Sequence, residues 1–322
     1  MSDAWIRRLA TTVIALALSA CSTAPQEGAS LTAAEYARTQ SAPTVSGQPD
    51  SSAAPANPTA GYLQFFHRWD TPLDDSATRT FSRVVGQATD FKAFTAVAPR
   101  GSEERRLFER HLAPFEEAAP LIRSGQMNED LFFDAWYDTP SSWKRARPYV
   151  FGMREEAGDP QLYRGFEWLA KHADEFWARR ESHPPSWQPI SYPVPTLSDQ
   201  AVYAAFNAIW STPRDALARE FVSALKARAK TFDDFSRIVT PGSEEYIKFD
   251  RVLCAYDQAG ALVKNGLLHP RLFFDAWQSP KELWESAEPW VKGLRASGRS
   301  PHAYDNVDWL VSYESEWRGN AK

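Results

Sequence analysis

The chain contains an internal duplication that covers most of its length. When the sequence is shifted by 141 residues, about 120 residues beginning at Tyr62 align without a gap with those beginning at Tyr203, and about a third of the paired residues are identical. Two stretches recur unchanged: Leu131–Trp136 as Leu272–Trp277, and Gly101–Glu104 as Gly242–Glu245. A repeat of this length predicts two domains with the same fold, and it gives most residues a counterpart for comparison.

Apolar residues recur at helical spacing in both copies. In the first copy a stripe runs from Phe108 to Ile122 in steps of four and three residues, and the second copy repeats it from Phe249 to Val263. This spacing places one apolar face on a helix. The expected N-caps are Ser102 and Ser243, and the expected left-handed residues at the C-terminal ends are Gly125 and Gly266.

Further helices are expected on either side of this long helix. In the first copy they run from Tyr62 to Trp69, from Phe81 to Val97, through the short, nearly all-buried hexamer, from about Ser142 to Arg154 with a kink or break at Pro148, and onward from Asp159-Pro160; the last helix of the second copy is expected to start at Ser300-Pro301. No segment alternates apolar and polar residues as a strand does. The predicted fold class is all-α, with two tandem bundles of about five or six helices each.

The first twenty-one residues carry the features of a secretion signal. Arg7 and Arg8 precede an apolar run from Leu9 to Ala20, which is too short to span a membrane. The ending Leu18-Ser19-Ala20-Cys21 resembles the lipobox of bacterial lipoproteins. This resemblance implies cleavage before Cys21, acylation of its thiol, and attachment of the mature chain to a membrane through acyl chains. Because Ser22 rather than Asp follows, it also implies the outer membrane, facing the periplasm, if the cell is Gram-negative.

Composition sets the expected domain boundaries. The stretch after Cys21 is rich in Ser, Ala, Thr and Pro, a composition that buries too little apolar surface to fold. Five prolines between Ser182 and Ser198 predict an extended connector, which Trp187 could pin to a bundle. We therefore expect a signal peptide at 1–20, the lipidated cysteine and a flexible tether at 21–59, the first repeat at 60–181, a linker at 182–200 and the second repeat at 201–322.

A set of residues in the second half of each copy carries a resemblance to a known family. In the first copy the set is Gly125, Trp143, Arg147, Pro148, Arg154, Pro160, Tyr163, Glu167, Trp168 and Leu169. With this set the chain resembles an uncharacterised bacterial family of small helical domains, often membrane-tethered, over about 70 residues per copy. The second copy departs from it at Glu288, opposite Arg147, and at Asp308, opposite Glu167. The resemblance implies no catalytic activity.

The sequence contains no recognised pattern for a cofactor or a metal. A net charge of −5 offers no excess of basic residues for a phosphate backbone, so nucleic acid is not an expected partner. Nucleotide-binding glycine motifs and the nucleophile elbow are absent from the sequence. The histidines lack the spacing of a helical zinc site and none is duplicated. Cys254 lies in an apolar helical context, which is typical of a buried thiol.

Carboxylates are the remaining candidates for chemistry. Glu103, Glu104 and Asp134, with Glu244, Glu245 and Asp275 in the second copy, would be the acid and base of a glycan hydrolase. The structural interpretation is favoured: the glutamates satisfy the start of a helix, and the aspartates form ion pairs. The predicted partners are Arg110 or Arg154 for Asp134, and Arg251 or Arg295 for Asp275.

Four tryptophans of the first copy recur in the second. The pairs are Trp69/Trp210, Trp136/Trp277, Trp143/Trp284 and Trp168/Trp309. Core packing is the favoured interpretation and a ligand groove is the alternative. Together these features predict a membrane-anchored lipoprotein of the cell envelope that binds or scaffolds a protein partner. The alternatives are an inhibitor or immunity lipoprotein against an envelope toxin or hydrolase, and a cell-wall glycan hydrolase.

Overall fold

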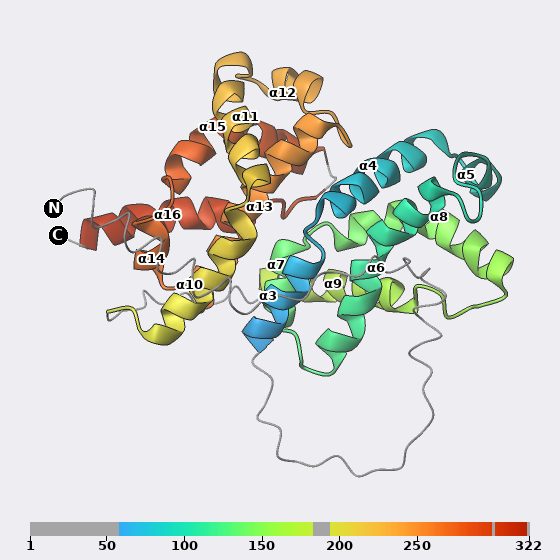
Figure 1. The fold of residues 1–322 in the computed structure, drawn as a ribbon, viewed down its shortest axis with the longest axis horizontal. Helices are drawn as coiled ribbons and strands as arrows, with labels where there is room; N and C mark the ends of the chain where they lie inside the picture. Colours follow the sequence, from blue (N-terminus) through green and yellow to red (C-terminus); the bar gives the residue numbers. More distant parts are fainter. Residues whose placement is uncertain (1–57, 183–193, 298–299, 321–322) are drawn as a thin grey trace, which may run out of the picture. The chain divides into compact units, whose positions relative to one another are not determined.

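The computed structural model describes residues 58–182, 194–297 and 300–320, which form fourteen helices and no strand (Figure 1). The first repeat holds α3 (Pro58–Arg68), α4 (Pro72–Gln87), α5 (Phe91–Val97), α6 (Glu103–Arg123), α7 (Glu129–Ala135), α8 (Thr139–Ala157) and α9 (Arg164–Ser182). The second holds α10 (Leu197–Trp210), α11 (Pro213–Arg228), α12 (Phe232–Ile238), α13 (Glu244–Lys264), α14 (Pro270–Phe274), α15 (Pro280–Ala296) and α16 (Asp305–Asn320). Cys21, Trp187, the expected signal peptide and most of the tether and linker lie outside the described residues.

Each described repeat contains seven helices, where five or six were expected. The apolar stripe from Phe81 to Val97 is divided between α4 and α5, because Asp90 caps a new helix through a 2.7 Å bond from the backbone N–H of Ala93. The expected ends of the long helices are confirmed. Ser102 and Ser243 accept N-cap hydrogen bonds, and the backbones of Gly125 and Gly266 are left-handed.

The expected start of the last helix is wrong by four residues in both repeats. Pro160 and Pro301 lie in a turn, and the helix begins only at Arg164 or Asp305. The residue just before each helix has a left-handed backbone, with φ of 55° at Tyr163 and 56° at Tyr304. A non-glycine residue with positive φ interrupts a helix, so the turn and the helix cannot merge.

Two other expectations, a kink or break at Pro148 and the end of the linker, differ from the structure. The helix α8 runs without a break through Pro148, and α15 runs through Pro289 in the same way. The helix α10 begins at Leu197, inside the expected linker, where Thr196 and Asp199 form a capping box. The linker between the repeats is therefore shorter than its proline content suggested.

The long helices α6 and α13 form the centre of each bundle. The helices α4 and α9 pack on α6, and α11 and α16 pack on α13. A glycine on the sixth helix of each repeat, α8 or α15, leaves room for an aromatic ring from the short third helix: Gly152 lies against Phe91, and Gly293 lies against Phe232. This pair is duplicated, so the same local fit closes both bundles.

The two repeats contact each other through different faces. From the first repeat, α7 packs on α13 and α3 packs beside α10. Asp70 is paired with Arg214 at 2.6 Å, and its other oxygen accepts a 2.9 Å bond from Arg251. Tyr62 accepts a 3.1 Å bond from Gln258. Because α7 covers it, α13 is buried almost all round from Phe249 to Val263, whereas α6 keeps a partly exposed face.

The residues with which the first repeat contacts the second have polar counterparts at the equivalent positions of the second repeat. Phe66, Asp70, Tyr137 and Trp177 contact the second repeat, at Trp210, Arg251, Tyr304 and His302 respectively. Their counterparts are Asn207, Ser211, Gln278 and Arg318. The second repeat therefore does not carry the side chains with which the first repeat contacts it.

Across the described ranges, no helix is both long and apolar enough to traverse a bilayer.

Candidate functional site

Arg110 and Arg251 each pair with the capping aspartate of the preceding long helix. Arg110 donates to Asp74 at 2.7 Å, and Arg251 donates to Asp215, the counterpart of Asp74. Both aspartates already belong to capping boxes with the threonine three residues earlier. The recurrence of Thr-Pro-x-Asp in both copies is the sequence signal that marks these partners.

Arg154 and Arg295 hold the turn that precedes the last helix. Arg154 donates from Nε to the carbonyl oxygen of Leu162 at 2.8 Å, and Arg295 donates in the same way to Ala303 at 2.9 Å. Arg154 also lies 3.0 Å from Glu167. Each arginine therefore satisfies a carbonyl group next to the left-handed tyrosine.

The partners predicted for the two hexamer aspartates are wrong. Asp134 is paired with Arg180 of α9, whose second nitrogen lies 3.2 Å away, and Asp275 is paired with Arg271 at 3.4 Å on the exposed side of α14. Asp134 is buried because α13 covers α7, and burial raises the pKa of its carboxyl group while Arg180 opposes that rise. The predicted arginines are already occupied elsewhere, which no pattern within one repeat reveals.

The carboxylates considered for hydrolysis do not form a pair. Glu103 and Glu104 begin α6, whereas Asp134 lies on α7, close to Trp136, whose ring meets that of Phe115 at 5.1 Å. Phe115 is twelve residues from Glu103, about 18 Å along the helix, and a glycan-cleaving pair needs carboxyl groups about 5 to 10 Å apart. Among the described residues, no group of three or more His, Cys, Asp or Glu side chains could hold a metal ion.

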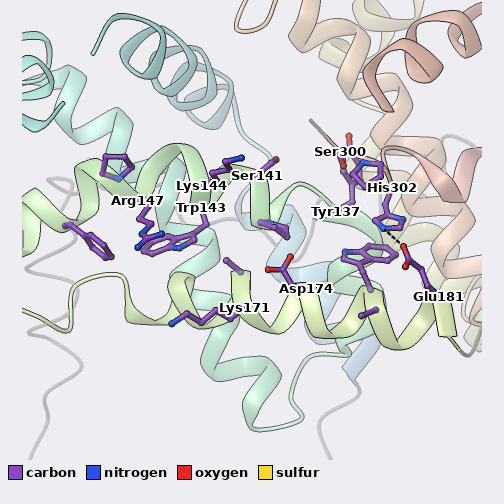
Figure 2. Close-up of a pocket in the computed structure, with 17 residues that line it drawn as sticks. Tyr137, Ser141, Trp143, Lys144, Arg147, Lys171, Asp174, Glu181, Ser300 and His302 are labelled. Carbon is purple, nitrogen blue, oxygen red and sulfur yellow. Dashed lines mark ion pairs between the residues drawn. The ribbon is translucent and has the colours of Figure 1, made fainter. Parts of the chain in front are cut away.

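An open groove lies between α8 and α9 of the first repeat (Figure 2). Its volume is about 850 Å³, and the turn that carries Ser300 and His302 closes one end. The side chains that line it recur every three or four residues along each helix, so one face of each helix forms a wall. Trp143 forms part of the floor, where it meets Phe166 edge to face at 5.2 Å, and Ala170 leaves room above it.

The closed end of the groove is a stacked pair. Trp177 and His302 lie parallel, 7° apart, with ring centroids separated by 4.0 Å. The histidine is held by Asp305 at 3.2 Å, and Glu181 lies 3.7 Å from its Nε2 (Figure 2). Trp177 and Glu181 of the first repeat therefore contact His302 of the second repeat directly at this end of the groove.

Charge is distributed unevenly along the groove. Lys144, Arg147 and Lys171 gather away from the His302 end, whereas Asp174 and Glu181 lie toward it (Figure 2). Lys171 is paired with Glu167 at 2.9 Å. Within the described parts of the chain, Lys144 and Arg147 are exposed and form no ion pair, although Arg147 rests 5.1 Å over the ring of Phe151.

The residues that line this groove are not kept in the second repeat. Its counterparts of Lys144, Arg147, Phe151, Lys171 and Trp177 are Glu285, Glu288, Lys292, Ser312 and Arg318. Basic positions become acidic and an aromatic wall becomes charged, while the floor tryptophan is kept as Trp284. The scaffold is thus shared and the groove surface belongs to the first repeat.

Sequence reasoning singled out Trp143 as a duplicated core residue but did not predict the groove between α8 and α9. Of the duplicated tryptophans, Trp143, Trp210 and Trp284 are buried, as expected for core packing, and Trp143 also lines the groove. Lys144 and Trp177 were not identified, because neither is duplicated. The signal that could have found the groove is a difference between the copies: Lys144 and Arg147, on one face of a helix, are replaced by Glu285 and Glu288.

Comparison with known families identifies the repeat. The model of a family described as a domain of unknown function, DUF4760, matches residues 63–173 and again residues 199–317. The chain belongs to the DUF4760 family. No curated protein and no solved structure matches the chain.

The two DUF4760 repeats coincide with the two helical bundles. Each match begins in the first helix of a repeat and extends into its last. Several residues that carried the resemblance in the sequence lie together: in the first repeat Arg154 contacts both the turn before Tyr163 and the carboxylate of Glu167. In the first repeat, these residues therefore fix the turn before the last helix.

Proposed function

We propose that this DUF4760 protein is a lipid-anchored binding module of the cell envelope, held through Cys21 and facing the periplasm, that presents the α8–α9 groove to a protein partner. The observation that carries the proposal is the groove itself, an open site with an aromatic floor in the first repeat. Its counterpart positions in the second repeat have changed while the core has been kept, which is the pattern expected when one copy binds and the other supports.

The groove offers binding surface rather than assembled catalytic groups. Its aromatic floor supplies apolar contact area, and its exposed lysine and arginine supply directional polar contacts at the rim. The candidate hydrolase carboxylates do not meet there. No contact among the described residues favours the inhibitor or the hydrolase alternative over a general binding role.

A photocrosslinking experiment tests the binding site. A benzoylphenylalanine crosslinker replaces Asp174 in the full-length chain, and in a matched control it replaces Ser315, the counterpart of Asp174 on α16. Both positions are exposed. We expect a discrete protein adduct in intact envelopes from position 174 alone. Equal adducts from both positions, or none from position 174, would contradict binding at the groove.

Anchoring has a separate test. The Cys21→Ser variant is expected to move from the membrane fraction to the soluble periplasmic fraction, because several acyl chains are needed for stable attachment. Unchanged membrane partition in this variant would show that the chain is held by something other than a lipid on Cys21.

A further inference from the structure

The charges of the groove specify more than an apolar partner. Lys144 and Arg147 project from one turn of α8 beside Lys171 of α9, and the first two have no carboxylate partner among the described residues (Figure 2). The protein as a whole is acidic, with a net charge of −5. A basic cluster on an acidic protein attracts anionic groups selectively, because the surrounding surface repels them.

The floor beside this cluster is apolar. Trp143 and Phe151 meet at 6.3 Å with their rings near perpendicular, and Pro148 lies on the same helix face. Further along the groove, Asp174 is exposed and has no ion-pair partner among the described residues. An occupant that fits this arrangement places a carboxylate and an apolar side chain close together at the end formed by Lys144 and Arg147, and carries no strong negative charge toward Asp174 and Glu181.

We infer that the groove binds an acidic polypeptide segment, with its carboxylates against Lys144 and Arg147 and an apolar side chain against Trp143 and Pro148. This inference rests on the proposed function and specifies the partner. A polypeptide places opposite charges and apolar groups a few residues apart, as the groove requires. An anionic bilayer is a uniform surface, and Asp174 and Glu181 in the same groove would repel it.

Peptide selection followed by charge reversal tests the inference. A random dodecapeptide library is selected on the full-length chain in detergent micelles, and the enriched peptides are labelled with fluorescein for anisotropy titrations. We expect net negative peptides that contain an apolar residue. The double variant Lys144→Glu, Arg147→Glu, which copies the charges of Glu285 and Glu288, is expected to weaken their binding at least tenfold, and added salt is expected to weaken it further.

A matched variant separates local from global charge. Arg83→Glu with Lys92→Glu makes the same change in net charge at two exposed positions of the first repeat that form no ion pair among the described residues. We expect it to change the dissociation constant less than twofold. Equal weakening by both double variants would overturn the inference, because the effect would then follow net charge alone.

Other outcomes identify a different occupant. Enrichment of neutral or basic peptides would overturn the acidic specificity, and so would charge-dependent binding of phosphatidylglycerol vesicles without selective peptide binding. If the crosslinker at position 174 still yields a protein adduct in that case, the binding function stands and only the chemistry assigned to the partner fails. If neither experiment detects binding, both the function and the inference fail.

Discussion

Two glycines carry the closest packing inside the bundles. A Cβ added at Gly152 would lie 2.1 Å from the ring of Phe91, and one added at Gly293 would lie 2.0 Å from Phe232. Both rings come from the short third helix of the repeat and are fixed by the core. The requirement for glycine at these positions is therefore steric and does not depend on a left-handed backbone.

Gly152→Ala and Gly293→Ala are each expected to lower the free energy of unfolding by about 1 to 3 kcal/mol, because the aromatic ring has to leave its site. The matched control is Gly86→Ala in α4, where nothing lies within 4 Å of the added Cβ. That change is expected to stabilise by about 0.5 to 1 kcal/mol through helix propensity. Urea unfolding of the three variants measures the contrast, and a loss of stability at Gly86 of the same size would contradict the steric explanation.

Asp250 is a carboxyl group whose ionisation opposes folding. Loss of surrounding water raises its pKa from 3.8 to about 6, the neighbouring Asp138 carboxylate adds to the rise, and the hydrogen bond from Tyr304 lowers it. The folded state therefore holds a proton that the unfolded state releases. The stability that this proton contributes is present below about pH 4 and is lost as the pH rises through 6.

Asp250→Asn is expected to be more stable than the parent by about 1 to 3 kcal/mol at pH 7.5, and the difference is expected to shrink toward pH 4. The amide oxygen can still accept the hydrogen bond from Tyr304. Chemical denaturation at both pH values measures this, with Asp174→Asn, at an exposed position, as the control for the loss of one carboxylate. Lower stability of Asp250→Asn at pH 7.5 would contradict the raised pKa.

At the scale of elements, identical sequences have different environments. The hexamer Leu131–Trp136 forms most of α7 and is largely buried, because α13 covers it. The same hexamer at Leu272–Trp277 only partly enters α14, and Asp275 and Ala276 are exposed. The sequence of the hexamer determines that it is a short apolar element, and its neighbours determine how much of it is covered.

This difference predicts unequal effects of the same substitution. Asp134→Asn leaves Arg180 without its partner at a site where the aspartate is only 4% exposed. Because burial raises the pKa of Asp134, removing its charge offsets part of that cost, and a loss of about 1 to 2 kcal/mol is expected. Asp275→Asn acts on an exposed pair and is expected to change stability by less than about 0.5 kcal/mol. Thermal and urea unfolding of the two variants compare them directly, and equal losses would show that α7 is not covered as described.

At the scale of the whole described molecule, Asp70 couples the repeats. It pairs with Arg214 and Arg251 of the second repeat, and Arg251 is in turn paired with Asp215 inside its own bundle. One carboxylate therefore links the capping network of α11 to the end of α3. The counterpart of Asp70 in the second repeat is Ser211, which has no carboxylate to form the equivalent ion pairs.

Asp70→Asn is expected to weaken this coupling by about 2 to 4 kcal/mol, because Arg251 is left with one of its two carboxylates in a buried site. We expect calorimetric unfolding to broaden toward two transitions, one for each repeat. Asp75→Asn is the control: Asp75 also pairs with Arg214, but burial already raises its pKa, so removing its charge costs little. A single sharp transition in Asp70→Asn, matching that of Asp75→Asn, would contradict the coupling.

Much of the fold followed from the sequence, and less of the site did. The N-caps at Ser102 and Ser243 and the left-handed Gly125 and Gly266 were correctly predicted because such features depend on residues three or four apart. The start of the last helix was missed because Tyr163 takes a left-handed backbone that its residue type does not suggest. The groove was missed because its walls come from side chains that are not duplicated.

The sequence by itself determined the duplication, the helical character of each unit and the residues that form each core, since helix caps and apolar faces arise from short-range interactions along the chain. The tertiary structure decided which carboxylate each arginine meets, which of two identical hexamers is covered, and where the groove opens. These depend on how helices distant in the sequence approach one another, and residues such as Asp70 and Arg251 meet only after both bundles have formed.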